Sequence, residues 1–193
     1  MTAFKNRAEA SIHYIKSAKI IEGIVAPFYE WAEAAIYSLI CVIFAFIFIF
    51  RIVGVEGPSM QPTLYNKERL ILMTFMYKPE RGDIVVIDRY TDEPLVKRVI
   101  ALEGDKVAIL PDTFEVVLNG VVQDEEYVDG KTVLREFGQG TKTVPEGCAF
   151  VMGDNRENSK DSRSSEIGFV NENDIVGKAV FRFHPIKRFG FLH

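Results

Sequence analysis

The stretch AAIYSLICVIFAFIFIF, residues 34–50, runs for seventeen residues without a formal charge. At about 1.5 Å per residue, a helix of this length spans roughly 26 Å, close to the ~30 Å hydrocarbon thickness of a bilayer. A helix that is apolar on every side needs more surrounding protein to bury it than a chain of 193 residues provides. The sequence therefore predicts a transmembrane anchor over residues 34–55, with the Arg51 side chain extending to the lipid–water boundary.

The residues before the anchor form a predicted tail, residues 1–33, that carries four cations and apolar positions at loosely helical spacing. An amphipathic helix on the membrane surface and a disordered tail both remain open for this segment. We expect the apolar run to be retained as an anchor, because it begins more than thirty residues into the chain and no small-x-small motif follows it. Lysine and arginine flank the run on both sides, so charge alone does not decide the orientation.

Residues 56–193 change to short runs rich in valine and isoleucine, separated by turns that contain glycine. Asn119-Gly120 is the strongest hairpin signal, because a type I′ turn needs two residues that tolerate positive φ. The pattern predicts a mostly antiparallel β domain, so that the fold class is mainly β behind an N-terminal transmembrane helix. The run 72–77 is either a core segment or an apolar lip at the bilayer. The predicted strands cover residues 69–72, 83–87, 95–102, 114–118, 131–134, 148–152 and 178–183.

Composition excludes several functional classes. The 23 basic residues are scattered among 27 acidic ones, and no basic stripe interleaved with aromatic residues is present, so we expect no nucleic-acid partner. His13, His184 and His193 lie far apart without acidic or cysteine partners at ligand spacing, and we expect no metal and no cofactor. Cys41 lies in the apolar run and Cys148 in the β domain, so the two are not expected to form a disulfide.

Ser59 lies nine residues after the end of the apolar run, and we expect it to be a nucleophile. A serine hydroxyl needs a base to remove its proton, and the histidines are poorly placed for that role. Lys97 lies in the apolar strand LVKRVI, residues 95–100, where alternation turns it and Arg98 to opposite faces. One of these two cations must face apolar surroundings.

Burial of that lysine would have a large effect on its charge. An ordinary lysine has a pKa of ~10.4, and moving it to near 7 requires roughly 4.6 kcal/mol of desolvation, which burial supplies. On strand context alone, two interpretations of Lys97 stay open, a solvated strand lysine and a buried general base.

Four ordered segments of the chain resemble the signature segments of type I signal peptidases, in the short, single-span form of Gram-positive-type bacteria. The segments are GPSMQPTL (57–64), RGDIV (81–85), KRVIALEGD (97–105) and GDNRENSKDSR (153–163). The resemblance extends from the span to about Phe191. It implies a membrane-bound serine endopeptidase that removes N-terminal signal peptides from secreted preproteins after small-x-small, Ala-x-Ala-like sites.

The resemblance also implies a role for each matching residue. Ser59 corresponds to the nucleophile, and its backbone N–H to the oxyanion donor. Lys97 corresponds to the general base, which Ser159 orients, and Asp161 with Arg163 corresponds to a supporting ion pair. The residues expected to contact substrate are Gly57, Met60, Leu64, Leu95 and Val96.

Gly57 is a departure from the pattern of those family members that place a second hydroxyl two residues before the nucleophile. We expect the Ser59 N–H to do more of the oxyanion stabilisation here, and we expect no loss of activity from Gly57 alone.

The same resemblance implies a single-pass protein of the cell membrane, with a cytoplasmic N-terminus and an extracytoplasmic catalytic domain over residues 56–193. Its expected partners are secretory preproteins and membrane lipid, and the sequence gives no indication of oligomeric state. Two alternatives remain open at this stage. One is a related Ser/Lys processing protease with another substrate, and the other is a non-catalytic, membrane-anchored β domain that binds a partner.

Overall fold

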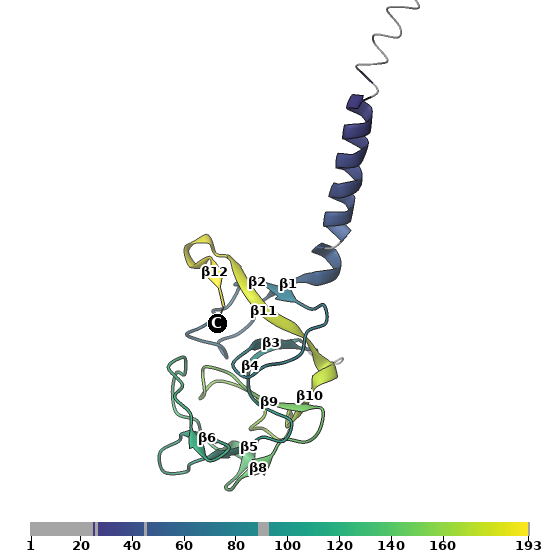
Figure 1. The fold of residues 1–193 in the computed structure, drawn as a ribbon. Helices are drawn as coiled ribbons and strands as arrows, with labels where there is room; N and C mark the ends of the chain where they lie inside the picture. Colours follow the sequence, from purple (N-terminus) through teal and green to yellow (C-terminus); the bar gives the residue numbers. More distant parts are fainter. Residues whose placement is uncertain (1–24, 26, 45, 89–92, 193) are drawn as a thin grey trace, which may run out of the picture. The chain divides into compact units, whose positions relative to one another are not determined.

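The structure, a computed structural model, describes residues 25, 27–44, 46–88 and 93–192. The chain divides into two compact units, Met1–Ile47 and Phe48–His193 (Figure 1). The predicted amphipathic tail lies mostly outside the described residues.

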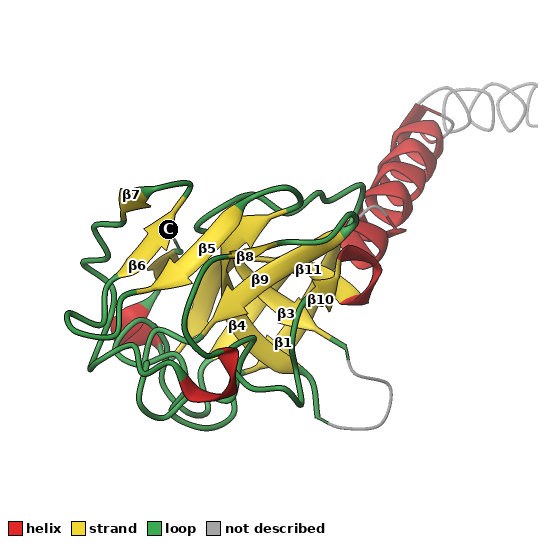
Figure 2. Ribbon diagram, turned by 90° about the horizontal axis from the view of Figure 1, so that it is seen from below, coloured by secondary structure: helices red, strands yellow, loops and turns green. Residues whose placement is uncertain are grey.

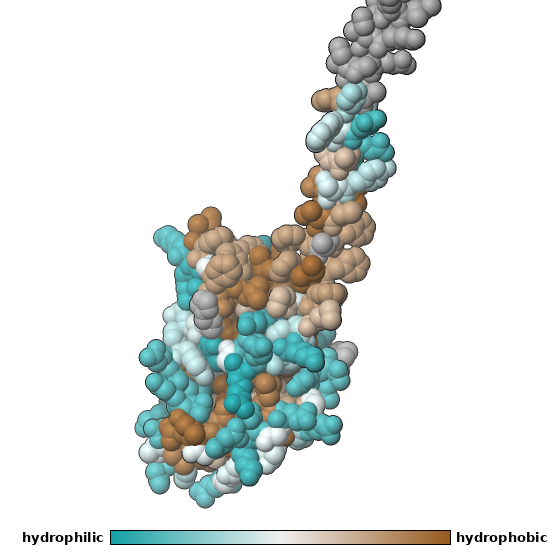
Figure 3. Space-filling view, in the orientation of Figure 1, coloured by the Kyte–Doolittle hydropathy of each residue, from teal (hydrophilic) through white to brown (hydrophobic). Residues whose placement is uncertain are grey.

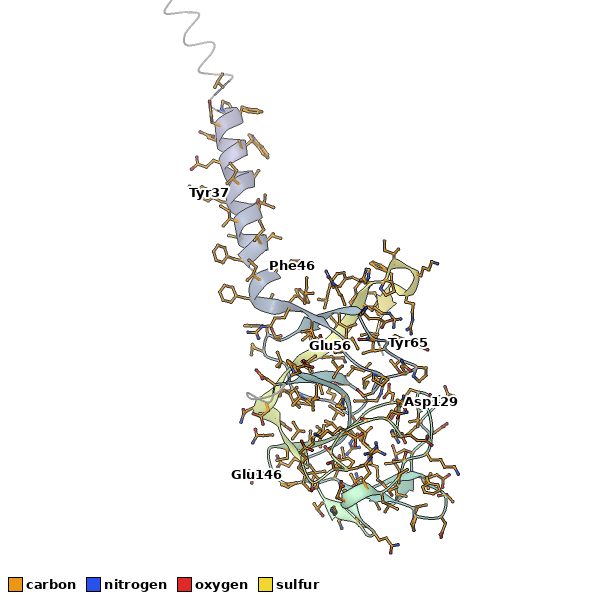
Figure 4. The ribbon with its side chains drawn as sticks, turned by 180° about the vertical axis from the view of Figure 1, so that it is seen from behind. Tyr37, Phe46, Glu56, Tyr65, Asp129 and Glu146 are labelled. Carbon is orange, nitrogen blue, oxygen red and sulfur yellow. The ribbon has the colours of Figure 1, made fainter. Side chains whose placement is uncertain are left out.

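A helix that includes Pro27–Ile49 lies mostly in the N-terminal unit and is long and apolar enough to cross a membrane, with a mean hydropathy of 2.4. Side chains such as Tyr37 and Phe46 project from the helix (Figure 4). The helix ends before the predicted end of the anchor, because residues 50–54 form strand β1 and bond to strand β2. The helix therefore ends at Ile49, and residues 50–54 of the predicted anchor are a strand.

The C-terminal unit is built on an eight-stranded sheet in the order β1-β2-β11-β3-β4-β9-β10, with β12 pairing to β11 (Figures 1 and 2). Neighbouring strands of this sheet run antiparallel throughout the described residues, which confirms the predicted fold class. The strands are β1 (Phe50–Gly54), β2 (Arg69–Met73), β3 (Ile84–Ile87), β4 (Leu95–Leu102), β9 (Cys148–Met152), β10 (Val170–Asn171), β11 (Ile175–His184) and β12 (Gly190–Phe191). Short 3₁₀ helices η2 (Glu172–Asp174) and η3 (Ile186–Arg188) flank β11.

A second, four-stranded sheet has the order β7-β6-β5-β8. Its strands are β5 (Lys106–Ile109), β6 (Val116–Leu118), β7 (Val121–Val122) and β8 (Lys142–Thr143), with the 3₁₀ helix η1 (Arg135–Phe137) before β8. The predicted hairpin is confirmed, because Asn119 and Gly120 have φ of 54° and 86° and connect the paired strands β6 and β7.

The predicted strand over residues 131–134 is wrong. Its polar groups bond to arginine side chains, since the Thr132 hydroxyl accepts from Arg156 and the Val133 carbonyl accepts from Arg163. This segment is therefore an irregular connection that leads into η1.

Three apolar clusters fill the C-terminal unit. The first cluster packs the connection that follows β1 against strands β2, β3 and β4. The second lies between the two sheets, and the third lies on the other face of β3 and β4. The run 72–77 begins in the core and ends at the surface, because Leu72 is fully buried whereas Phe75 and Met76 are 60% and 85% exposed. Contact of these exposed side chains with a bilayer stays a prediction.

Gly177 in β11 lies in close contact with the backbone of β2, and its substitution measures how tightly these two strands pack. A Cβ atom at Gly177 would lie 2.4 Å from the Met73 carbonyl oxygen of β2, whereas one at Gly190 would meet nothing within 4 Å. We expect Gly177→Ala to lower the free energy of unfolding by about 2 kcal/mol, because backbone atoms must move apart. Gly190→Ala is the control and should change it by less than about 0.5 kcal/mol. Urea unfolding of the full chain in detergent, followed by circular dichroism, measures both, and equal midpoints would contradict the tight packing at Gly177.

Candidate active site

Ser59 lies in the connection between β1 and β2, which we call the Ser59 loop (residues 55–68). Two backbone bonds of 2.8 Å close the loop, from the Val55 N–H to the Glu68 carbonyl and from the Lys67 N–H to the Val55 carbonyl. Figure 4 labels Glu56 and Tyr65, near the two ends of this loop. The loop is a short extension of a paired hairpin, and this pairing fixes the position of Ser59.

The Lys97 amine meets the Ser59 hydroxyl across the site. Its Nζ lies 3.0 Å from Ser59 Oγ and also donates to the Val96 carbonyl at 2.8 Å. Lys97 is only 2% exposed, so of the two interpretations of this residue the buried one describes the structure. The separation of Nζ and Oγ is within the range for direct proton transfer.

Burial lowers the pKa of Lys97 from 10.5 to about 8, while the negative charges of Asp161 and Asp154 oppose the shift. A pKa near 8 leaves roughly a tenth of the molecules with a neutral amine at pH 7, against fewer than about one in a thousand for an ordinary lysine. Desolvation thus produces a base at neutral pH.

Arg98, the other cation of this strand, is buried as well, at 3% exposure. Its Nε and Nη2 bond to the two carboxylate oxygens of Asp154 at 2.9 and 2.8 Å, and Asp154 also accepts from the Thr63 hydroxyl at 2.5 Å. The sequence analysis expected one of the two neighbouring cations to face apolar surroundings and did not predict this ion pair. A second buried cation in an apolar strand needs an acidic partner, and this requirement could have indicated a buried aspartate or glutamate.

The segment 153–163 packs against the backbone of the Ser59 loop. The Asn155 N–H donates to the Ser59 carbonyl at 3.1 Å, and the Asn155 side chain donates to the Pro58 carbonyl at 3.3 Å. A Cβ atom at Gly153 would lie 2.4 Å from the Ser59 carbonyl oxygen and 2.2 Å from Ser159 Oγ. Only glycine at position 153 allows this approach.

Asp161 and Arg163 form a fully buried, two-bond ion pair, with both N–O distances at 2.8 Å. Burial would raise the pKa of the Asp161 carboxyl, but the Arg163 guanidinium and the Gly153 N–H hold it below its ordinary value. Asp161 is therefore an ionised acid within electrostatic range of Lys97.

Ser159 lies beside this pair but does not bond to the lysine. The Ser159 hydroxyl is buried, and among the described residues it has no hydrogen-bond partner of normal geometry. It is nevertheless close enough to the Asp161 carboxylate to stabilise its charge. The structure thus brings Ser159 into the site without the predicted Ser159–Lys97 bond.

Arg156 anchors the middle of the same segment and was missed by the sequence analysis. Its side chain is fully buried, bonds twice to the Glu125 carboxylate at 2.7 Å and donates to the Gly153 carbonyl at 3.2 Å. No sequence signal links Glu125 to Arg156, because they lie 31 residues apart and only the second sheet brings them together.

The predicted substrate-contacting residues separate into two groups. Met60, Leu64 and Val96 belong to one buried cluster beside the Ser59 loop. Leu95 packs into a different cluster on the other face of the sheet. The structure thus groups three of these side chains with the Ser59 loop and does not group Leu95 with them.

Gly57 has a φ of 77°, and its N–H donates to the Asn66 side chain at 3.3 Å. A side chain at this position would have open space but a strained backbone. No hydrogen bond involves the Ser59 N–H among the described residues, so this donor is free.

Two unpaired strand edges meet at the site. β1 is the terminal strand of the sheet, and β4 pairs with β9 only from Arg98 onward, so residues 95–97 bond to β3 alone. The 3.0 Å contact between Lys97 and Ser59 brings the edge of β4 next to the continuation of β1. The described residues hold no group of three or more His, Cys, Asp or Glu side chains that would bind a metal.

Comparison with known proteins gives a consistent result. The family model described as "Signal peptidase, peptidase S26" matches residues 28–184. A signal peptidase I of Bacillus caldolyticus is 41% identical over 170 residues, which cover 80% of this chain and 91% of the relative. Signal peptidase I S of Bacillus subtilis is 39% identical over 168 residues, covering 81% of this chain and 89% of the relative. A crystal structure of a signal peptidase I from Enterococcus faecalis is 32% identical, covers 53% of this chain and 97% of that one, and superposes with a TM-score of 0.43.

The depressed pKa of Lys97 predicts a pH-dependent stability. The unfolded chain binds one more proton than the folded chain between about pH 8 and 10.5, so stability rises with pH across this window. From pH 7 to pH 9.5 the free energy of unfolding of the natural chain should gain about 2 kcal/mol relative to that of Lys97→Met. Urea unfolding of both proteins in detergent at the two pH values measures this difference. A constant difference would show that Lys97 titrates normally in the folded chain.

Proposed function

Because the chain belongs to the signal peptidase family, peptidase S26, we propose that Ser59 and Lys97 are its catalytic nucleophile and general base. It is a membrane-bound serine peptidase that removes signal peptides. The observation that carries the dyad is the 3.0 Å contact between Lys97 Nζ and Ser59 Oγ at a lysine removed from water.

Proton transfer follows from this geometry. The neutral Lys97 amine takes the proton of the Ser59 hydroxyl as Oγ attacks the carbonyl carbon of the scissile bond, and the resulting ammonium gives the proton to the leaving amine. An acyl-enzyme remains on Ser59. Lys97 then takes a proton from the attacking water and returns it to Ser59 Oγ when the ester breaks.

The oxyanion that forms in both steps needs a donor close to Ser59. The Ser59 backbone N–H has no partner among the described residues and serves this role, as Gly57 offers no hydroxyl. The contact of Asn155 with the Ser59 carbonyl holds this peptide in place.

Lys97 also needs a fixed rotamer. The Val96 carbonyl accepts one of its protons, and the buried, unpartnered Ser159 hydroxyl supports a role for Ser159 as the second orienting group. The Asp161–Arg163 pair holds the segment that carries Ser159.

The preprotein enters as an added strand in this proposal. An extended peptide would pair with the backbone of Glu56, which makes no hydrogen bond to the described residues, and with the edge of residues 95–97, as in β-augmentation. In this proposal the small side chain before the cut contacts the apolar cluster of Met60, Leu64 and Val96, which are 1%, 0% and 8% exposed. An apolar contact surface of this kind is compatible with cleavage after small-x-small sites.

Membrane lipid is the second proposed partner. The register places Ile52, Ile71, Phe181 and Phe191 in one row across β1, β2, β11 and β12, and Ile52 and Phe191 are 68% and 74% exposed. We call this row the apolar face, and Figure 3 shows apolar side chains gathered over these strands. Since β1 begins at the residue after the apolar helix that ends at Ile49, a lipid surface is the natural cover for the apolar face.

The dyad is tested with a purified preprotein that carries an Ala-x-Ala site. We expect Ser59→Ala and Lys97→Ala to lower the cleavage rate at least 10³-fold, because each removes a group that moves the proton. Gly190→Ala is the matched control and should cleave at the natural rate.

The pH dependence separates the base from a structural lysine. For the natural chain, kcat/KM should rise with pH and level off above about pH 8, as Lys97 loses its proton. A flat profile, or unchanged cleavage by either dyad variant, would exclude the mechanism. Uncut preprotein with the natural chain would favour the non-catalytic binding domain, and cleavage only at other sites would favour a related protease with another substrate.

The proposed topology has the N-terminus in the cytoplasm and residues 56–193 outside. Protease added to intact cells without an outer membrane should digest the C-terminal unit while cytosolic proteins stay whole. If digestion occurred only after the cells were opened, the orientation would be reversed.

A further inference from the structure

A cavity of about 510 Å³ lies beside the Ser59 loop, between residues 65–68 and the turn after β11. Asn66 at its wall holds the Gly57 N–H, and His184 pairs with Arg69 in the sheet register, next to the row that forms the apolar face. The cavity therefore opens where the apolar face ends and a row of basic residues begins.

The charges in the cavity are predominantly positive. Glu68, its only carboxylate, is 2% exposed and bonds to Arg188 at 2.8 Å and to Arg182 at 3.3 Å, so two guanidinium groups share one negative charge. Lys67 and His184 make no side-chain hydrogen bond or ion pair with the described residues. A net positive cavity is notable in a chain of net charge −4.

Arg188 is held in position before any ligand arrives. Its guanidinium stacks on Tyr65 at 4.3 Å and donates to the Pro62 and Thr63 carbonyls, both at 3.2 Å. Its side chain remains 34% exposed. A preorganised guanidinium beside a free lysine is a suitable arrangement for a phosphate group.

We propose that this cavity binds the phosphate of an anionic phospholipid, with Lys67, His184 and Arg188 around the headgroup and the acyl chains along the apolar face. The assignment rests on the proposed membrane anchoring. An anionic group with an apolar tail matches both surfaces, and the chain reaches β1 directly from the predicted span. A free phosphate would use the cavity but leave the apolar face uncovered.

The site can be tested locally because the chain has only three histidines. The full chain in a non-ionic detergent is titrated with dihexanoyl phosphatidylglycerol, dihexanoyl phosphatidylcholine or inorganic phosphate while the histidine ring signals are followed by NMR. His184→Gln assigns the His184 signal. We expect saturable shifts of His184 with phosphatidylglycerol at concentrations at least tenfold below those of the other two probes, and no shift of the other histidines.

Lys67→Asn removes one cation and keeps a residue that tolerates the φ of 69° at this position. It should weaken binding of phosphatidylglycerol roughly fivefold, the effect of one cation at an anionic surface. Lys106→Asn, an exposed position in the second sheet, is the matched control and should bind as the natural chain does.

Each contrary outcome overturns the assignment. No His184 shift, or equal shifts with phosphatidylcholine, would exclude an anionic headgroup site, and tighter binding of inorganic phosphate would exclude the lipid. If Lys106→Asn weakened phosphatidylglycerol binding as much as Lys67→Asn does, the loss would reflect general attraction between the lipid and the charged protein and not a specific site. Cleavage of a soluble preprotein by His184→Gln in lipid-free detergent should stay normal, because His184 lies outside the Ser59 loop, so this result separates the lipid site from the peptidase.

Discussion

Lys97 shares a water-free space with several charged groups, and burying an unpaired charge costs several kcal/mol. Asp154 and Asp161 both lie near enough to stabilise an ammonium, and left alone either would hold the lysine in its charged form. Arg98 binds Asp154, and Arg163 binds Asp161. Among the buried cations in the described part of the chain, Lys97 is then the one without a carboxylate of its own. Burial lowers the pKa of this lysine, and the arginine partners of Asp154 and Asp161 limit how strongly these two carboxylates oppose that shift.

The same pairs hold the backbone of the site. Arg156 ties Gly153 to Glu125, and the bridge between Asp129 and Asn155 attaches the segment to the connection that follows β7. The second sheet therefore supports the segment that touches the Ser59 carbonyl. A shift of this segment would move the nucleophile and the base together, since Arg98 and Lys97 are neighbours in β4.

The parts of this structure that the sequence predicted are those with a local signal. The type I′ turn at Asn119-Gly120 and the Val-rich strands follow from nearest neighbours, and the Ser59–Lys97 pair followed from motif resemblance. The end of the helix could not be predicted from the sequence. Residues 50–54 are apolar enough to continue a membrane helix or to form a strand, and their pairing with β2 decides between the two. Residues 131–134 look like a strand, yet arginines from the segment 153–163 take their polar groups. The Glu125–Arg156 pair joins two loops that lie 31 residues apart in the sequence, and no local sequence pattern indicates it.

The topology connects the substrate edge to the membrane surface. β1 is at once the terminal strand, with an edge open for a peptide, and a carrier of the apolar face through Ile52. A peptide added along the continuation of this strand extends a sheet whose outer side rests on lipid in the proposed arrangement. In the proposed arrangement the apolar part of a signal peptide stays in the bilayer while its small-residue end reaches Ser59. In this arrangement cleavage next to a membrane-embedded segment requires no extraction of that segment, because the strand proposed to bind the substrate also carries the apolar face proposed to meet the lipid.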